Sequence, residues 1–166
     1  KTGPEDLNNF HRCVTTGVPR LGGNFGAGPY TFYQIMQTSD HLAFISEAFH
    51  DARLIALSGH PHVAETIRQW NGDARGHWDG DTLVIETRNF STGSYFRGSA
   101  DGLRLVERLT RTGPGTITYQ LTFTDPTTWA SPWTAEIPLK RRDQWIYEFA
   151  CHEGNVSMRG MLRTAR

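Results

Sequence analysis

The chain has 166 residues, of which 37% are hydrophobic and 11% aromatic, enough for one domain with a substantial core. Its 17 Lys and Arg residues balance 17 Asp and Glu residues, which argues against a sequence-independent nucleic-acid surface and against a polybasic membrane anchor. No apolar run approaches the roughly 18 residues of a membrane-spanning helix, so we expect no membrane insertion.

The predicted elements begin with an irregular arm. Residues 1–29 are rich in Gly, Asn and Pro, and we expect them to pack as this arm on a single domain formed by residues 30–166. Short apolar segments between turn residues predict strands over 30–37, 42–49, 53–57, 74–78, 82–87, 103–111, 116–124, 133–139 and 145–149. Residues 155–166 are expected to form a short helix.

Two of these strand pairs carry the clearest local patterns. Asp79-Gly80 between strands predicts a type I′ hairpin, because glycine tolerates positive φ. In 116–124, apolar residues alternate with Thr and Gln, which is the period of a strand with one buried face. Strands joined mostly by hairpins favour an all-β fold, an antiparallel β-barrel of lipocalin-like or calycin-like type. A β-sandwich is the alternative.

The cysteines Cys13 and Cys151 lie near opposite ends of the chain. A disulfide between them would close a loop of more than about 100 residues and stabilise the fold by roughly 4–5 kcal/mol in the chain-entropy model. The alternative is two unrelated buried thiols. We favour the disulfide, which implies an oxidising compartment, so the expected location is the periplasm or the cell exterior.

Carboxylates occur in the middle of predicted strands, with apolar neighbours around them: Glu47, Glu86, Glu107, Glu136 and Glu148. A carboxylate on an apolar face is costly to bury unless it is paired. One interpretation is a barrel interior that carries acids able to transfer protons. The alternative, which we favour, is an exterior face or internal pairing with arginine, the candidates being Arg53, Arg75, Arg88 and Arg108.

Histidines are the second chemical feature. His60-Pro61-His62, followed by Glu65, is similar to the first metal motif of cupins, except that only two residues separate His62 from Glu65. His60 and His62 are therefore candidate metal ligands. The alternative, which the loop-like sequence favours, is a surface loop with two solvated imidazoles.

Several long motifs resemble an uncharacterised family of bacterial secreted proteins with GRWEGDTLVVET-like and YEYACHEGN-like segments. They occur here in order over 75–90, 107–111, 125–141 and 147–155. The resemblance covers most of the chain, from about Arg12 to Arg166, and implies secretion; both Cys13 and Cys151 fall in its motif segments. The family's usual DGRPH segment is SGHPH here, over 58–62. The family has no established activity, so the resemblance supports the scaffold and the compartment.

Two functions fit these patterns. The first is an enzyme of the lyase, isomerase or hydrolase type that acts on a small molecule in the barrel by acid–base chemistry, with or without a metal. Its candidate catalytic residues are His152, Glu148, His77 and Glu107. The second is a lipocalin-like carrier of a hydrophobic or aromatic ligand, without catalysis. In its favour, Gly76-His77-Trp78 resembles the Gly-x-Trp of lipocalins.

Both functions require a small-molecule ligand or substrate as the partner. We expect Trp78, Tyr147, Glu86 and Arg75 to contact it. The sequence firmly implies no cofactor, and a divalent metal is the one candidate. The identity of the ligand and the oligomeric state stay open.

Overall fold

The computed structural model describes residues 3–15, 17–18, 32–94 and 96–164. Within these ranges the chain forms eight strands, three short 3-10 helices and one α-helix. The strands are β1 Tyr33–Gln37, β2 His41–Ser46, β3 Ala52–Ala56, β4 Asp73–Asp79, β5 Thr82–Arg88, β6 Arg104–Gly113, β7 Thr116–Thr124 and β8 Trp133–Lys140. The helices are η1 Pro4–Asp6, η2 Phe10–Arg12, η3 Ala48–His50 and α2 Val156–Thr164.

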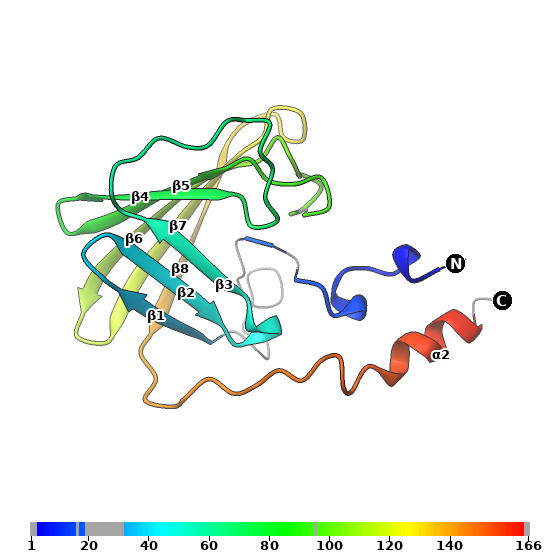
Figure 1. The fold of residues 1–166 in the computed structure, drawn as a ribbon. Coiled ribbons are helices and arrows are strands. Elements are labelled where there is room, and N and C mark those ends of the chain that lie inside the picture. The colour runs from blue at the N-terminus through cyan, green and yellow to red at the C-terminus, as the bar shows by residue number, and fades with distance from the viewer. Residues whose placement is uncertain (1–2, 16, 19–31, 95, 165–166) are drawn as a thin grey trace.

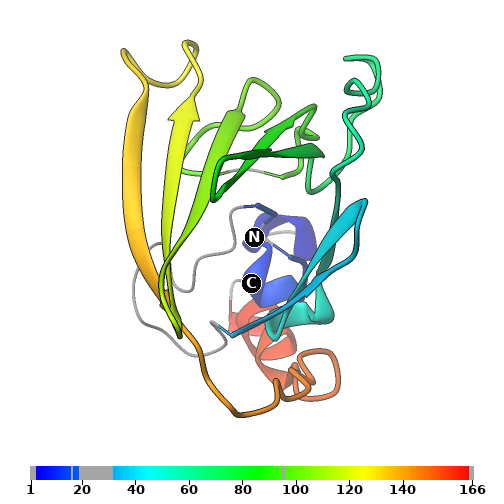
Figure 2. The same ribbon diagram turned by 90° about the vertical axis from the view of Figure 1, so that its left-hand side faces the viewer.

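All eight strands belong to one sheet in the order β1 to β8. The sheet curls into a half-barrel, with β1–β3 facing β7–β8 across the interior (Figures 1 and 2). This confirms the predicted all-β, barrel-like fold. Neighbouring strands are antiparallel except β3 and β4, which run parallel and meet at the single pair Ala56 and Arg75.

The alternating residues of each strand place one set inside the half-barrel. One inward row crosses four strands and consists of Ile85, Glu107, Leu121 and Ala135. The next row ends in Phe123 and Trp133, whose rings stack with centroids 4.2 Å apart. The predicted period-two pattern of 116–124 is therefore correct, and its apolar residues contribute to the core.

The hairpin predicted at Asp79-Gly80 forms, but its turn differs from the prediction. Asp79 pairs with Thr82, so the two central residues are Gly80 and Asp81. Gly80 has φ 58°, whereas Asp81 does not have positive φ. A type I′ turn needs positive φ at both central positions, so the type I′ prediction is wrong.

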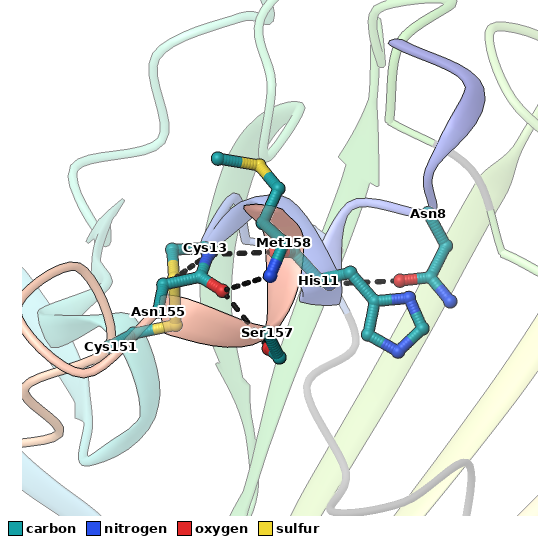
Figure 3. Close-up of a disulfide and its surroundings, with 7 residues drawn as sticks. All are labelled: Asn8, His11, Cys13, Cys151, Asn155, Ser157 and Met158. Atoms are coloured by element: carbon teal, nitrogen blue, oxygen red, sulfur yellow. Dashed lines mark hydrogen bonds between the residues drawn. A yellow bond between two sulfur atoms is a disulfide. The ribbon is translucent and has the colours of Figure 1, made fainter. Parts of the chain in front are cut away.

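A disulfide joins Cys13 to Cys151, with an S–S distance of 2.08 Å and a sequence separation of 138. It fastens the C-terminal segment to the N-terminal arm, and α2 lies on the same side of the half-barrel as η1 and η2 (Figure 1). Asn155 reinforces this junction by donating to the His11 carbonyl at 2.8 Å (Figure 3). The predicted disulfide and the predicted C-terminal helix are confirmed.

The ninth predicted strand, over 145–149, is wrong. Residues 145–150 follow an elongated course (Figure 1) but pair with no strand in the described part of the chain. Trp145 is 83% exposed and Tyr147 is 73% exposed. The end of the segment is held away from the sheet, because Cys151 is bound to the arm and Phe149 packs edge-on against Phe49.

In the described residues, no helix is long and apolar enough to cross a membrane.

Candidate functional site

The interior of the half-barrel contains a buried ion pair between Glu107 of β6 and Arg53 of β3. Glu107 follows the inward alternation of β6 and its side chain is fully buried. The Arg53 side chain reaches Glu107 through the interior of the half-barrel. Its Nη1 donates to Glu107 Oε1 at 2.9 Å, and its Nη2 donates to Glu107 Oε2 at 2.5 Å. This two-point geometry is the one that an arginine fork and a carboxylate favour.

Two hydroxyl groups complete this network. Tyr119 of β7 donates its hydroxyl hydrogen to Glu107 Oε1. Arg53 Nη2 also donates to Thr87 Oγ1 of β5 at 2.5 Å. The network thus joins β3 directly to β5 and β6, and through Glu107 to β7, across the place where β3 and β4 share only one pair. It ties the two halves of the curled sheet together.

The surroundings of Arg53 and Tyr119 shift the pKa of both side chains upward. Burial lowers the pKa of Arg53, but the Glu107 carboxylate outweighs burial and the pKa is raised above its ordinary value. Burial, together with the negative charge of Glu107, raises the pKa of Tyr119 well above its ordinary range. At neutral pH, Arg53 is therefore charged and Tyr119 is a hydrogen-bond donor.

A cavity of about 40 Å³ lies beside this network. It is large enough to hold a water molecule, whose share of liquid volume is about 30 Å³. Its wall combines apolar and polar groups, and it is lined by Val18, Tyr33, Phe44, Ser46, Asp51, Arg53, Tyr119 and Leu139. Tyr33 belongs to β1 and Leu139 to β8, which are the two edge strands of the sheet. The cavity therefore lies where the half-barrel is not closed by strand pairing.

Asp51 is the acidic group of this cavity and is held in place from two sides. Its Oδ2 accepts a hydrogen bond from Thr15 Oγ1 at 2.8 Å, and its Oδ1 accepts one from Asn71 Nδ2 at 2.9 Å. Trp70 adds a second tie to the arm by donating from Nε1 to the Thr15 carbonyl at 2.9 Å. Thr15 and Val18 of the arm therefore lie beside the cavity.

A second hollow, of about 110 Å³, lies beside the disulfide. It is lined by Glu148 and His152, two of the four predicted catalytic residues, and also by Glu153. Its apolar wall includes Phe49 and Phe149, and the disulfide fixes its position against the arm. The catalytic role of these residues stays a prediction.

The other predicted site residues lie apart from both hollows. His77 and Glu86 are exposed, on β4 and β5. Arg75 is held at the start of β4, where its Nη1 lies 2.7 Å from Asp73 Oδ1. Trp78 is half exposed near the Gly80 turn, and Tyr147 projects from the extended C-terminal segment. The structure does not gather these residues around one ligand.

The two candidate metal ligands also differ in environment. His60 is exposed, whereas His62 is mostly buried and its Nδ1 lies 2.8 Å from Asp73 Oδ2. Asp73 Oδ2 also accepts a hydrogen bond from the backbone N–H of Val63, so this contact fastens the 57–72 loop to β4. Among the residues that the structure describes, no group of three or more His, Cys, Asp or Glu could hold a metal ion.

Sequence reasoning selected Glu107 but missed most of its surroundings. Arg53 was only one of four candidate partners, and Tyr119, Ser46 and Asp51 were not selected as site residues. Tyr119 could have been found, because the hairpin around Pro114 places it opposite Leu109, two residues from Glu107. Ser46 and Asp51 could not, since they reach the cavity through non-local packing.

The chain matches no family model, no curated protein and no solved structure in the comparisons with known proteins. The resemblance to a secreted bacterial family therefore stays a prediction, and function has to be argued from the geometry.

Proposed function

We propose that this protein is a carrier that binds a small, largely apolar molecule in the cavity of the half-barrel. The observation that carries the proposal is the composition of the cavity wall. Tyr33, Phe44 and Leu139 supply apolar area, while Arg53 and Tyr119 form a polar corner and Ser46 and Asp51 add further polar groups. A concave, mostly apolar site with a few convergent polar groups is typical of small-molecule binding.

The fixed charges of the polar corner favour binding over catalysis. Acid–base catalysis needs a group that gains and loses a proton near the working pH. The raised pKa values of Arg53 and Tyr119 keep both protonated at neutral pH. They serve as fixed donors that neutralise and enclose Glu107, so this corner orients a ligand instead of exchanging protons with it.

The size of the cavity implies that the ligand enters by displacing side chains. A cavity of about 40 Å³ is far smaller than a drug-sized site, which occupies roughly 300–1,000 Å³. The wall can yield most easily between Tyr33 and Leu139, because β1 and β8 are edge strands that do not pair with each other. Entry between these strands leaves the ion pair of Arg53 and Glu107 intact.

The disulfide supports an extracytoplasmic location for this carrier. Disulfides persist in oxidising compartments and are rare in reducing ones. The bridge between Cys13 and Cys151 is the anchor of the whole C-terminal segment. The proposed carrier therefore works in the periplasm or outside the cell.

Fluorescence titration with N-phenylnaphthylamine, an uncharged apolar dye, tests this function. We expect saturable dye binding that Leu139→Trp abolishes, because the larger ring fills the cavity. The matched control is Ile137→Trp on the same inward side of β8, since Ile137 packs against the core but does not line the cavity. Equal dye affinity in wild type and Leu139→Trp would show that ligand does not bind there.

A catalytic function is the second candidate, favoured by the hollow beside the disulfide. That hollow places an imidazole, from His152, with two carboxylates, from Glu148 and Glu153, and such a set can transfer protons. Hydrolysis of p-nitrophenyl acetate by the intact protein tests it. Turnover lost in both His152→Ala and Glu148→Ala would support an acid–base enzyme, and turnover absent from the wild type would remove this support.

A further inference from the structure

The segment over 144–148 has features of a β-strand, but it pairs with no other strand in the described part of the chain. Its sequence has the residue alternation that predicted a strand. In the described structure, the backbone N–H and C=O groups of 142–148 make no hydrogen bond. Trp145 and Tyr147 are among the most exposed large hydrophobic side chains described. Exposed backbone of this kind is a template for pairing with another strand.

A matching surface lies at the opposite edge of the sheet. β1 is an edge strand, and Met36, Ala43 and Leu54 lie opposite one another across β1, β2 and β3. Met36 is 52% exposed and Leu54 is 66% exposed. The row beside it consists of Gln34, Ile45 and Ala52. We call these two rows the β1–β3 outer face, and they contain no charged side chain.

The outer face of β6, β7 and β8 is more polar than the β1–β3 outer face. There, one row across β6, β7 and β8 consists of Arg108, Gln120 and Glu136. The adjacent row toward the strand ends consists of Val106, Thr122 and Thr134. An antiparallel sheet with one solvated face normally carries polar residues there. The β1–β3 outer face departs from this pattern, and contiguous apolar exposure marks an interaction site.

We propose that two copies of the chain associate by exchanging these parts, so that segment 144–148 of each copy adds to the β1 edge of the other. Among the described residues, segment 144–147 and the β1 edge over 34–37 pair with no further strand, and a two-fold axis can pair both at once. Residues 144–147 and the β1–β3 outer face are both uncharged, so their contact removes no charge from water. Main-chain hydrogen bonds provide the pairing, as in strand addition generally.

Charge fixes the direction of the added strand. Antiparallel addition places the residues before the segment, Arg141 and Arg142, next to the turn that follows β1 in the other copy. That turn carries Asp40, whose side chain is 61% exposed. Trp145 then lies beside Met36 and extends the row of Met36, Ala43 and Leu54. Parallel addition would instead separate the arginines from Asp40 by the length of β1.

Sedimentation velocity of the full, disulfide-intact chain over a concentration series tests the exchange. We expect a reversible dimer. Two variants should each weaken it about tenfold or more, as loss of interface anchors does: Trp145→Ser combined with Tyr147→Ser, and Leu54→Lys. Because the replaced side chains are exposed, their thermal unfolding should match that of the wild type. Thr134→Lys on the outer side of β8 is the control and should leave the dimer unchanged.

Mixing the two variants separates exchange from other contacts. The Leu54→Lys copy keeps its segment and the Trp145→Ser/Tyr147→Ser copy keeps its β1 edge, so the mixture should form a heterodimer with one intact contact. A chain that stays monomeric at every concentration overturns the proposal. The proposal is equally overturned if the monomer instead binds phosphatidylcholine vesicles through Trp145 and Tyr147. A dimer that both variants leave unchanged also overturns it.

Discussion

At the scale of single residues, the buried pair of Arg53 and Glu107 is the feature with the largest energetic consequence. Removing a charged pair from water is costly, and the two-point hydrogen bonding compensates for that cost only while both partners are present. The side chain of Arg53 is 10% exposed and that of Glu107 is fully buried. The surface pair of Arg108 and Asp79 provides a comparison, because its atoms are as close but the side chains are 41% and 63% exposed.

Replacing Arg53 alone should therefore destabilise the fold severely. Arg53→Met leaves the Glu107 carboxylate buried with Tyr119 and no cation, and we expect a loss of roughly 3–5 kcal/mol in the free energy of unfolding. Arg53→Met combined with Glu107→Leu should recover most of that loss, because no uncompensated charge remains. The control, Arg108→Met, should cost less than about 1 kcal/mol. Urea unfolding followed by tryptophan fluorescence measures all three. A small loss for Arg53→Met would mean that water reaches Glu107.

Asp125 gives the fold a defined response to acid. Asp125 is buried, with 3% of its surface exposed, and its carboxylate accepts hydrogen bonds from the hydroxyl groups of Ser99, Thr127 and Thr128. Burial alone would raise its pKa, but these hydrogen bonds lower it to about 2, from an ordinary value of 3.8. The ionised form is therefore favoured in the folded state, and this contribution to stability is lost as the pH falls from about 4 to about 2.

The variant Asp125→Asn isolates this contribution. Above about pH 4 it should melt at a clearly lower temperature than the wild type, and the difference should shrink as the pH approaches 2. Asp143→Asn removes the same charge from an exposed site and serves as the control. Thermal unfolding by circular dichroism over this pH range measures the difference. A constant gap between the wild type and Asp125→Asn would mean that titration of Asp125 does not contribute.

At the scale of elements, the sequence predicts a strand well where its alternation and its partners are both local. β7 follows β6 through a short turn around Pro114, so the alternation of Ile117, Tyr119, Leu121 and Phe123 is sufficient to place it. The same alternation over 145–149 is misleading, because the end of that segment is held by Phe149 and the disulfide. Alternation thus shows that a segment can be a strand, and the rest of the chain decides its partner.

The parallel pairing of β3 with β4 could not be predicted from local sequence either, because distant residues decide which strands pair. The connection over 57–72 could return the chain in either direction, and its course depends on contacts between distant residues. Asp73 holds the loop at Val63, and Asn89 donates to the Val63 carbonyl at 3.0 Å. The residues of the candidate site were likewise predictable only where local sequence identifies them. Glu107 could be found because a carboxylate stands out among apolar residues, whereas its partner Arg53 is 54 residues away.

At the scale of the whole molecule, two ends of one chain are held together by a single covalent bond. The sheet is complete by Lys140, and the described chain beyond it makes few contacts until Phe149 and Cys151 reach the arm. The disulfide closes a loop of 138 residues, for which the chain-entropy model gives about 5 kcal/mol. Its stabilisation acts by restricting the unfolded chain more than by adding contacts to the folded one.

Removing the disulfide should therefore lower the melting temperature markedly while the sheet still forms. We expect Cys13→Ser combined with Cys151→Ser to behave like the reduced wild-type chain, because both lose the same loop constraint. Calorimetry measures the melting temperature, and far-ultraviolet circular dichroism reports whether the strands persist. Reduction that leaves the melting temperature unchanged would mean that packing of Phe149 against Phe10 and Phe49 already fixes the C-terminal segment. The disulfide would then be a consequence of that packing and not its cause.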